Sequence, residues 1–206
     1  MNSQQRQTKN CNNDLECKKE REKINVNFFN AKKIELHAHL SGSVRESTVF
    51  ELLGEEDEQV IEMRHKNKRT LAECFLLFPI IHRALNSPQV LAQVTREVLQ
   101  DFEAENCVYL ELRTTPKPIK RVDPATGVET VLLSKEGYLE TVLNVIREYE
   151  EADGKKMIVR LLISIDRSRG VDEAIETLDL VLKYKNDTHI VGIDFSGTHS
   201  YSLLIY

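Results

Sequence analysis

The sequence lacks the features of nucleic-acid-binding, membrane-spanning and secreted proteins. It has no excess of basic residues, since 28 lysines and arginines are outnumbered by 33 aspartates and glutamates, giving a formal net charge of −5. This balance supplies no positive field for nucleic acid or for an anionic membrane. No apolar run approaches the length of a membrane-spanning helix. Residues 1–23 are polar and have no apolar centre, so they do not form a secretory signal.

The sequence also lacks a cysteine pattern typical of metal-binding modules, since the spacing of its four cysteines matches no zinc-finger pattern. We expect Cys74 and Cys107 to be buried thiols, because they lie in a helical and a strand-like segment. A disulfide between Cys11 and Cys17 would require export from the cell. We therefore predict a reduced protein located in the cytosol.

What the sequence does contain is an alternation of strand-like and helical segments after a polar leader. Residues 1–29 are rich in Asn, Gln and Lys, and we expect them to be disordered. Apolar patterns predict strands over residues 32–40, 107–113, 156–166 and 189–197. Amphipathic patterns predict helices over residues 43–54, 71–85, 87–106, 134–154 and 170–187, with a kink at Pro79. Residues 55–70 are expected to form a charged surface excursion, and residues 118–133 a loop.

This order predicts β-α-β units and a parallel sheet. Polar residues follow the end of each predicted strand, in the stretches "HAHLSG", "RTTPK", "DRSRG" and "DFSG". Active sites of (β/α)₈ barrels are built at this face, and doubly wound open sheets follow a similar rule, so the pattern alone leaves both folds open. The absence of a glycine-rich phosphate loop after the first strand argues against a dinucleotide-binding fold.

The first strand ends in His-Ala-His. Residues two apart on a strand project from the same face, so His37 and His39 are predicted to point the same way. Two imidazoles so placed can supply two ligands to a zinc ion, which in catalytic sites usually has three protein ligands and a water. The alternative is that one histidine is structural and the other is half-exposed.

Five segments, taken in order, resemble the adenosine deaminase family. They are "IELHAHLSGS", "RTLAECF…IH", "CVYLELRTTPK", "VRLLISIDR" and "VGIDFSG", and together they cover about residues 30–197. The resemblance is strongest to the branch of adenosine deaminase-like proteins that deaminate N6-methyl-AMP. It implies a zinc-dependent (β/α)₈ TIM barrel that replaces the amino or alkylamino group on the six-carbon of a purine with hydroxyl. The chain would then be an α/β protein comprising about the first four βα units.

The resemblance also implies roles for individual residues. His37 and His39 would be zinc ligands, and His39 would in addition lie beside the substrate. The other implied substrate contacts are Ser41, His82, Thr114, Thr115, Pro116, Lys117, Asp166 and Gly197. The hydroxyls and the ammonium of residues 114–117 would suit a phosphate.

Several of these residues have structural alternatives. His82 can be a polar residue at the edge of a helix face, and residues 114–117 can be a capped loop. Asp166 can pair with Arg167 or Arg169, while Gly197 can be a turn glycine. Serine occupies position 41, where this branch of the family usually has asparagine, and its shorter side chain weakens that assignment.

The resemblance implies that the third zinc histidine and the catalytic glutamate follow later strands. We therefore expect no catalytic residue within this chain, the glutamate lying beyond Tyr206. The chain is expected to be an N-terminal half, inactive alone, with residues 198–206 as a divergent apolar tail. Its partner would be a small-molecule purine nucleotide, with no nucleic acid and no membrane.

An incomplete barrel has open edges. We expect the interior side chains Ile34, Leu36, Leu110 and Ile193 to lose their facing layer, and we predict self-association through these edges. Two other hypotheses remain open. The chain can belong to a different zinc or iron amidohydrolase, or it can be a non-catalytic protein that binds zinc weakly or binds a partner.

Overall fold

The structure, a computed structural model, is built around a four-stranded parallel sheet. It describes residues 30–54, 57, 58, 60, 61, 70, 73, 76–154 and 157–197. The strands are β1 (Lys33–His39), β2 (Cys107–Thr114), β5 (Ile158–Asp166) and β6 (Ile190–Ser196), in the order β1-β2-β5-β6. All four predicted strands are thus confirmed. The predicted leader, the apolar tail and most of the charged excursion lie outside the described residues.

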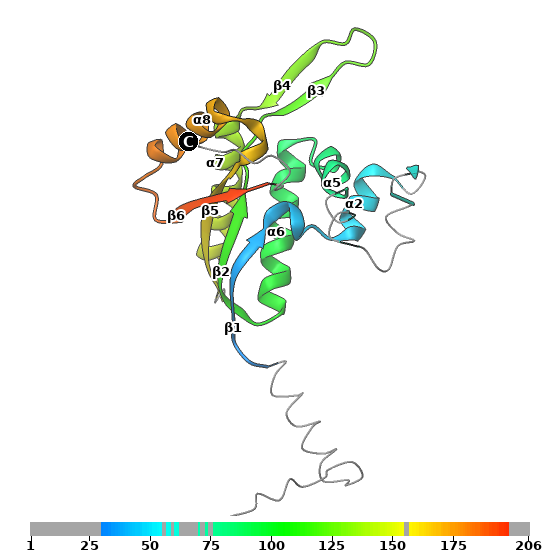
Figure 1. Ribbon diagram of the computed structural model, residues 1–206. Helices are drawn as coiled ribbons and strands as arrows, with labels where there is room; N and C mark the ends of the chain where they lie inside the picture. The colour runs from blue at the N-terminus through cyan, green and yellow to red at the C-terminus, as the bar shows by residue number, and fades with distance from the viewer. Residues whose placement is uncertain are drawn as a thin grey trace, which may run out of the picture.

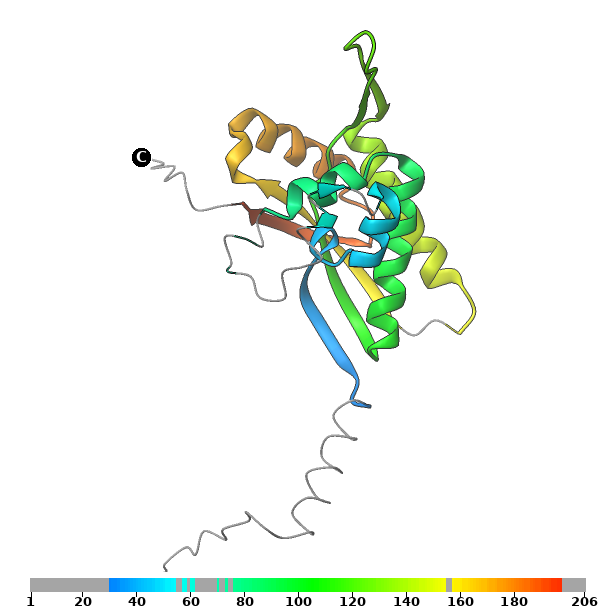
Figure 2. The same ribbon diagram turned by 90° about the vertical axis from the view of Figure 1, so that its right-hand side faces the viewer.

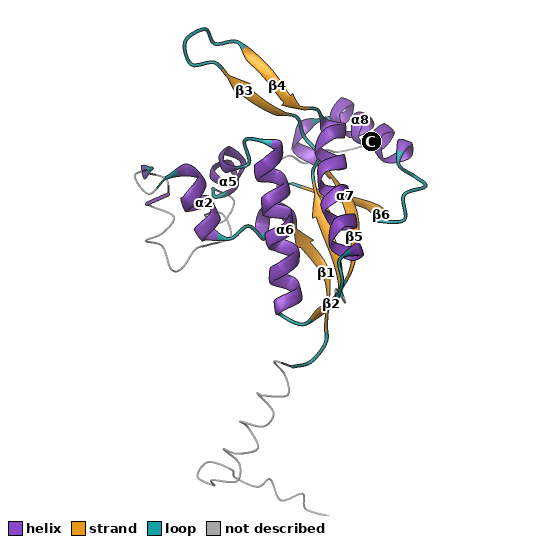
Figure 3. Cartoon of the chain, turned by 180° about the vertical axis from the view of Figure 1, so that it is seen from behind, coloured by secondary structure: helices purple, strands orange, loops and turns teal. Residues whose placement is uncertain are grey.

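The helices connect the strands, and the three longest of them pack against the sheet. They are α2 (Glu46–Leu53), α5 (Phe78–Ala84), α6 (Pro88–Ala104), α7 (Lys135–Glu151) and α8 (Val171–Lys183), with short 3₁₀ turns η1 (Leu40–Gly42) and η2 (Arg167–Arg169). Figures 1 and 3 show α6 and α7 side by side against the sheet. In the part of the chain that the structure describes, no helix has the length and hydrophobicity that a membrane crossing would need.

Serine caps begin the two long helices, as their sequences predict. The Ser87 hydroxyl accepts a hydrogen bond from the Val90 amide at 3.2 Å, and Pro88 occupies the first helical position. The Ser134 hydroxyl likewise accepts from the Gly137 amide at 3.0 Å. Each cap satisfies an amide that has no partner within its helix, which fixes where α6 and α7 begin.

The core lies between the sheet and this helical layer. Alternate residues of β5, namely Val159, Leu161 and Ile163, are fully buried, as period-2 packing requires. They meet apolar residues of the helices: Leu91, Val94 and Leu99 from α6, and Leu139, Leu143 and Ile146 from α7. The buried thiol of Cys107 opens β2 as predicted.

Three expectations from the sequence are wrong. Residues 118–133 are not a loop but contain the antiparallel hairpin of β3 (Ile119–Val122) and β4 (Glu129–Leu133), which projects from the body of the molecule in Figures 1 and 2. Its strands are mostly exposed, so they have no apolar alternation for sequence reasoning to detect.

Pro79 does not kink a helix over 71–85. A turn at residues 76–77 precedes α5, and Pro79 lies in the first turn of α5, where a missing amide costs nothing.

The third error concerns the exposed apolar side chains. Ile34 and Leu36 are exposed as expected, but Leu110 is fully buried on the helical side of the sheet. Ile193 is 37% exposed and pairs in register with Ile163, so it too faces the helical side rather than the opposite face.

A polar chain crosses the opposite face of the sheet. Arg113 on β2 forms an ion pair with Asp194 on β6, and both side chains are nearly buried, at 15% and 12% exposure. The Ser164 hydroxyl on β5, between them, donates to Asp194 at 3.1 Å, and Arg113 Nη2 donates to the Leu36 carbonyl on β1 at 3.1 Å. One arginine and one aspartate therefore connect all four strands.

The pairing of β1 with β2 is irregular. Glu35 pairs with Leu110 and Ala38 pairs with Leu112, so three steps on β1 match two on β2. A shift of the opposite sense occurs between Lys33 and Ile34, which pair with Cys107 and Tyr109, and the extra residue between Glu35 and Ala38 forms a β-bulge. After it, His39 pairs with Arg113, which brings the last histidine of β1 beside the polar chain.

We predict that Asp194→Asn lowers the free energy of unfolding by about 3 kcal/mol, because it leaves the Arg113 charge buried without its partner. Glu105→Gln is the matched control. It removes the charge that pairs with Lys33 at 2.7 Å on the surface, where the Glu105 side chain is 70% exposed, and should cost less than about 1 kcal/mol. Urea unfolding followed by circular dichroism measures the free energy of unfolding of both variants. Equal losses would show that the Arg113–Asp194 pair stabilises the protein no more than a surface ion pair does.

Candidate functional site

A pocket of about 740 Å³ lies at the carboxyl ends of the strands. Eight of the ten residues proposed from the sequence line it: His39, Ser41, His82, Thr114, Thr115, Lys117, Asp166 and Gly197. The two others, His37 and Pro116, lie within two residues of a lining residue. Pro116 is buried, and the exposed His37 lies outside the lining. Strand ends, η1, η2 and α5 thus bring together residues that are far apart in the sequence.

The two histidines of β1 point the same way, as predicted. Their ring centroids are 5.3 Å apart. Burial lowers the pKa of His39, the Asp194 carboxylate raises it, and His37 and Arg113 lower it further. The net lowering keeps His39 neutral at physiological pH, which is the form that binds metals.

These two imidazoles fit part of a zinc site. Nitrogen ligands two residues apart on one strand suit a tetrahedral ion, which needs at least one more protein ligand. Among the described residues, no group of three or more His, Cys, Asp or Glu side chains is arranged to hold a metal. His37 and His39 therefore fit as two ligands of a set that the described residues do not complete.

The position of the Asp166 carboxylate requires a glycine at position 197. The Oδ1 atom of Asp166 accepts hydrogen bonds from the Ser168 amide at 3.0 Å and hydroxyl at 2.7 Å. Gly197 has a φ of +105°, and a Cβ added there would lie 2.6 Å from that same Oδ1. Only glycine permits this backbone conformation and this close approach. Asp166 also lies 3.4 Å from Arg169, so the proposed pairing with Arg169 occurs as well.

The segment after β2 forms one wall of the pocket. The buried hydroxyl of Thr114 lies 3.0 Å from the Tyr138 hydroxyl of α7, which anchors the end of the strand. Lys117 has no hydrogen bond or ion pair with any described residue. Burial, and then the positive charge of Arg169, lower the pKa of Lys117 to about 8.

His82 lies in the last turn of α5, with its ring 6.3 Å from the Phe78 ring. Although this side chain is partly open to solvent, burial against the pocket wall lowers its pKa, and the charges of Lys117 and Arg169 lower it further. Asp166 opposes the shift. A neutral imidazole here can donate one hydrogen bond and accept another.

Sequence reasoning missed several lining residues: Phe78, Leu85, Arg113, Tyr138, Ser168, Arg169 and Ser196. Arg113, Ser168 and Ser196 lie in the polar stretches at the strand ends, so the pattern that indicates their neighbours indicates them as well. Tyr138 lies inside an amphipathic helix and carries no such signal.

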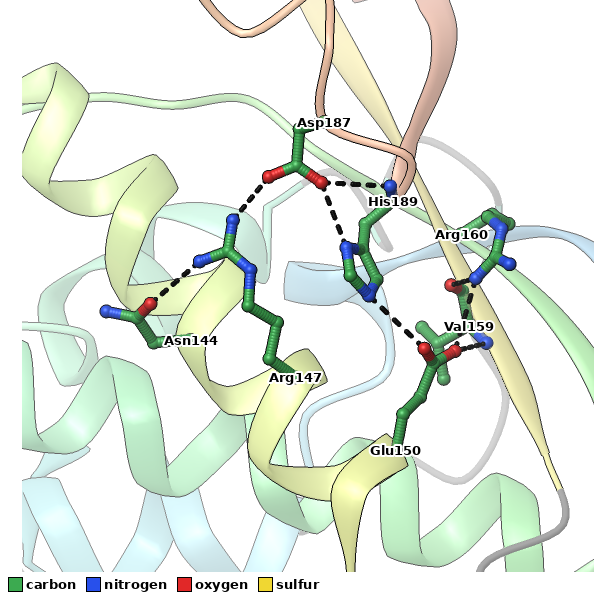
Figure 4. A network of polar contacts seen from close by, with 7 residues as sticks. All are labelled: Asn144, Arg147, Glu150, Val159, Arg160, Asp187 and His189. Carbon is green, nitrogen blue, oxygen red and sulfur yellow. Dashed lines mark hydrogen bonds and ion pairs between the residues drawn. The ribbon is translucent and has the colours of Figure 1, made fainter.

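His189 lies at the end of its strand away from the pocket. It precedes β6 and joins a separate polar network, shown in Figure 4. Its Nδ1 lies 2.9 Å from Asp187 and its Nε2 lies 3.2 Å from Glu150, which also accepts from the Val159 amide and from Arg160. The network ties α7 to β5 at the end of the sheet opposite the pocket.

The comparison with known proteins gives consistent matches. The sequence model of the adenosine deaminase family matches residues 32–202. The chain belongs to the adenosine deaminase family. An N6-mAMP deaminase of Arabidopsis thaliana is 42% identical over 192 residues, covering 80% of this chain and 51% of that protein. An N6-methyl-AMP deaminase of Homo sapiens is 35% identical over 172 residues, covering 80% of this chain and 46% of that protein.

A solved structure shows the same relationship. The crystal structure of arabidopsis ADAL complexed with IMP is 43% identical, with a TM-score of 0.69, and the match covers 84% of this chain and 52% of that chain. The chain therefore spans about half the length of the curated relatives that it matches. The α/β fold class is confirmed, with the parallel sheet forming part of a (β/α)₈ barrel.

We predict that Gly197→Ala destabilises the protein more than Gly154→Ala. Both glycines have a positive φ, but a Cβ at Gly154 would meet nothing within 4 Å. Gly154→Ala should therefore cost only the left-handed backbone strain of about 1–2 kcal/mol. Gly197→Ala should cost at least about 1 kcal/mol more, because it also displaces Asp166. Thermal unfolding compares the two, and equal costs would show that the contact with Asp166 is unimportant.

A second prediction concerns pH. The ammonium form of Lys117 attracts anions, and its pKa of about 8 places the loss of that charge just above neutrality. Affinity for inorganic phosphate should therefore fall as the pH rises above about 8, and binding of this anion should raise the pKa of Lys117 and take up protons. Calorimetry in buffers of different ionisation enthalpy measures this uptake. An arginine at position 117 stays charged at this pH, so Lys117→Arg should remove the fall in affinity. If affinity still falls in this variant, a group other than Lys117 causes the pH dependence.

Proposed function

We propose that this chain forms the nucleotide-binding part of a hydrolytic deaminase that acts on a purine nucleoside monophosphate, with N6-methyl-AMP as the preferred substrate. The supporting observation is that eight residues chosen from five separate segments line one pocket. The names of the most similar relatives support the same substrate, and one solved relative was crystallised with IMP. Because the chain spans about half of these proteins, the activity is proposed for the whole enzyme.

The proposed roles follow from the position of each group. His37 and His39 would hold a zinc ion together with a ligand from a later part of the barrel, and His39 would also border the substrate. Zinc would lower the pKa of a bound water to about 7 and so supply hydroxide at neutral pH. Ser41 and His82 would form hydrogen bonds with the purine nucleoside.

The remaining residues would bind the sugar and phosphate. Asp166 accepts hydrogen bonds, and its ionised state suits a ribose hydroxyl. Burial raises its pKa, but hydrogen bonds from Ser168 and the charge of Arg169 lower it more. Thr114, Thr115, Pro116 and Lys117 would form the phosphate-side wall. Gly197 would allow the ligand to approach the backbone.

The catalytic acid is proposed to lie outside this chain. Two imidazoles alone hold zinc weakly, and proton transfer to the purine needs a positioned acid. We therefore propose that the chain alone is inactive, with self-association through its open strand edges. A non-catalytic protein that binds zinc weakly, and a different amidohydrolase, are the competing functions. The location in the cytosol remains a prediction.

A chimeric enzyme tests the proposal. Residues 30–197 would replace the matching half of the Arabidopsis N6-mAMP deaminase, which supplies the rest of the barrel. We expect one bound zinc per chain and release of methylamine from N6-methyl-AMP. His37→Ala and His39→Ala should each remove the zinc, measured by metal analysis, while circular dichroism confirms that the barrel is folded.

Substrate comparison within this chimera tests the phosphate assignment. Lys117→Ala should raise KM for N6-methyl-AMP about tenfold, as expected for losing one charge-assisted hydrogen bond, and should leave N6-methyladenosine nearly unchanged. Equal effects on both would give Lys117 a structural role. A folded, zinc-loaded chimera that converts neither N6-methyl-AMP nor adenosine would contradict the proposed function.

A further inference from the structure

The pocket lining carries more positive than negative charge. It contains three cationic side chains, Arg113, Lys117 and Arg169, but one carboxylate, that of Asp166. Arg113 is neutralised by Asp194 on the floor of the pocket. Two cations therefore face a single carboxylate in a protein whose formal net charge is −5. A local excess of cations within an acidic protein is a feature of sites that bind anions.

The charged groups of the pocket fall into two neighbourhoods. His39 interacts electrostatically with His37, Arg113 and Asp194. His82 interacts instead with Lys117, Arg169 and Asp166. The first neighbourhood lies on the strands, whereas the second lies on α5, η2 and the segment after β2. A ligand that extends from His39 to the second neighbourhood would place any negative charge beside Lys117 and Arg169.

Arg169 has free hydrogen-bond donors in this position. Its Nε lies 3.4 Å from Asp166 Oδ2, and the Arg169 side chain is 40% exposed. The Oδ1 atom of Asp166 is already bonded twice by Ser168. The Nη1 and Nη2 groups of Arg169 donate to none of the described residues. Asp166 therefore orients the guanidinium through one edge and leaves the other donors available.

Lys117 and Arg169 repel each other without an anion between them. Neither charge has an ion pair other than the 3.4 Å contact of Arg169 with Asp166, among the described residues. An ammonium supplies a point charge, whereas a guanidinium supplies parallel donors that match two phosphate oxygens. The combination suits a phosphate better than a carboxylate or a neutral sugar.

We propose that Arg169 is a specificity-determining residue that binds the phosphate of a nucleoside monophosphate together with Lys117, and that Asp166 positions it. This inference rests on the proposed function, since it assigns the phosphate end of the same pocket. Discrimination between nucleotide and nucleoside then depends on η2, the turn after β5, as well as on the segment after β2.

Binding measurements on the chain test this assignment, with inorganic phosphate, AMP and adenosine as ligands in isothermal titration calorimetry. Arg169→Gln should weaken AMP about tenfold and change adenosine less than about twofold. Arg169→Lys should recover part of the loss, because a point charge lacks the bidentate geometry. Arg96→Gln is the control for net charge. Arg96 pairs with Glu148 on the surface at 3.4 Å, outside the pocket, and its loss should affect neither ligand.

The outcomes separate this proposal from the proposed function. Equal weakening of AMP and adenosine by Arg169→Gln would overturn it and leave Arg169 as a support for Asp166. Unchanged AMP binding would also overturn it, while the purine pocket would remain. If phosphate and AMP bind equally well and depend on Arg169, while adenosine does not bind, the phosphate role stands and the purine function fails. If neither phosphate nor AMP binds, the phosphate role is overturned.

Discussion

The ion pair between Arg113 and Asp194 determines how the sheet and the pocket fit together. Its partners lie on β2 and β6, on either side of β5, and both are nearly buried. A buried charge is tolerated only when its partner is held in place, so the pair fixes the relative positions of these strands. His39 is in register with Arg113, and its electrostatic surroundings include both members of the pair. The fold and the proposed metal-binding residues therefore share one layer of side chains.

The pocket combines residues of the sheet with residues of connecting segments. Its floor is formed by strand residues that β-sheet pairing and the ion pair hold in place. Its opposite wall is formed by η2, the segment after β2 and the short helix α5, which lie outside the sheet. Such a division keeps a reacting centre constant while sequence changes in connecting segments alter which ligand is accepted. Arg169 and Lys117 both belong to the connecting segments.

Sequence reasoning predicted the features that depend on periodicity and on residue type at strand ends. The four strands, the capped helices and the shared face of His37 and His39 all follow from local patterns. It failed where the determining contacts are distant in sequence. The hairpin of β3 and β4 has exposed strands and no apolar alternation. The face of Leu110 is set by its pairing with the buried Val159 of β5, which the sequence of β2 alone does not show. The dependence of Asp166 on Gly197 joins residues 31 positions apart, so the sequence shows two polar strand ends but not their contact.

The exposed beginning of β1 has a consequence for how the protein can vary. The register of β1 against β2 shifts between Lys33 and Ile34 and again between Glu35 and Ala38, whereas Ala38 and His39 pair in regular register. A one-residue insertion or deletion before His37 would reverse the facing of the residues on one side of it. Reversing the outer residues is cheap, because Ile34 is already 65% exposed and has little packing to lose. The exposure of the outer residues therefore protects the orientation of both imidazoles from length changes at the beginning of the strand.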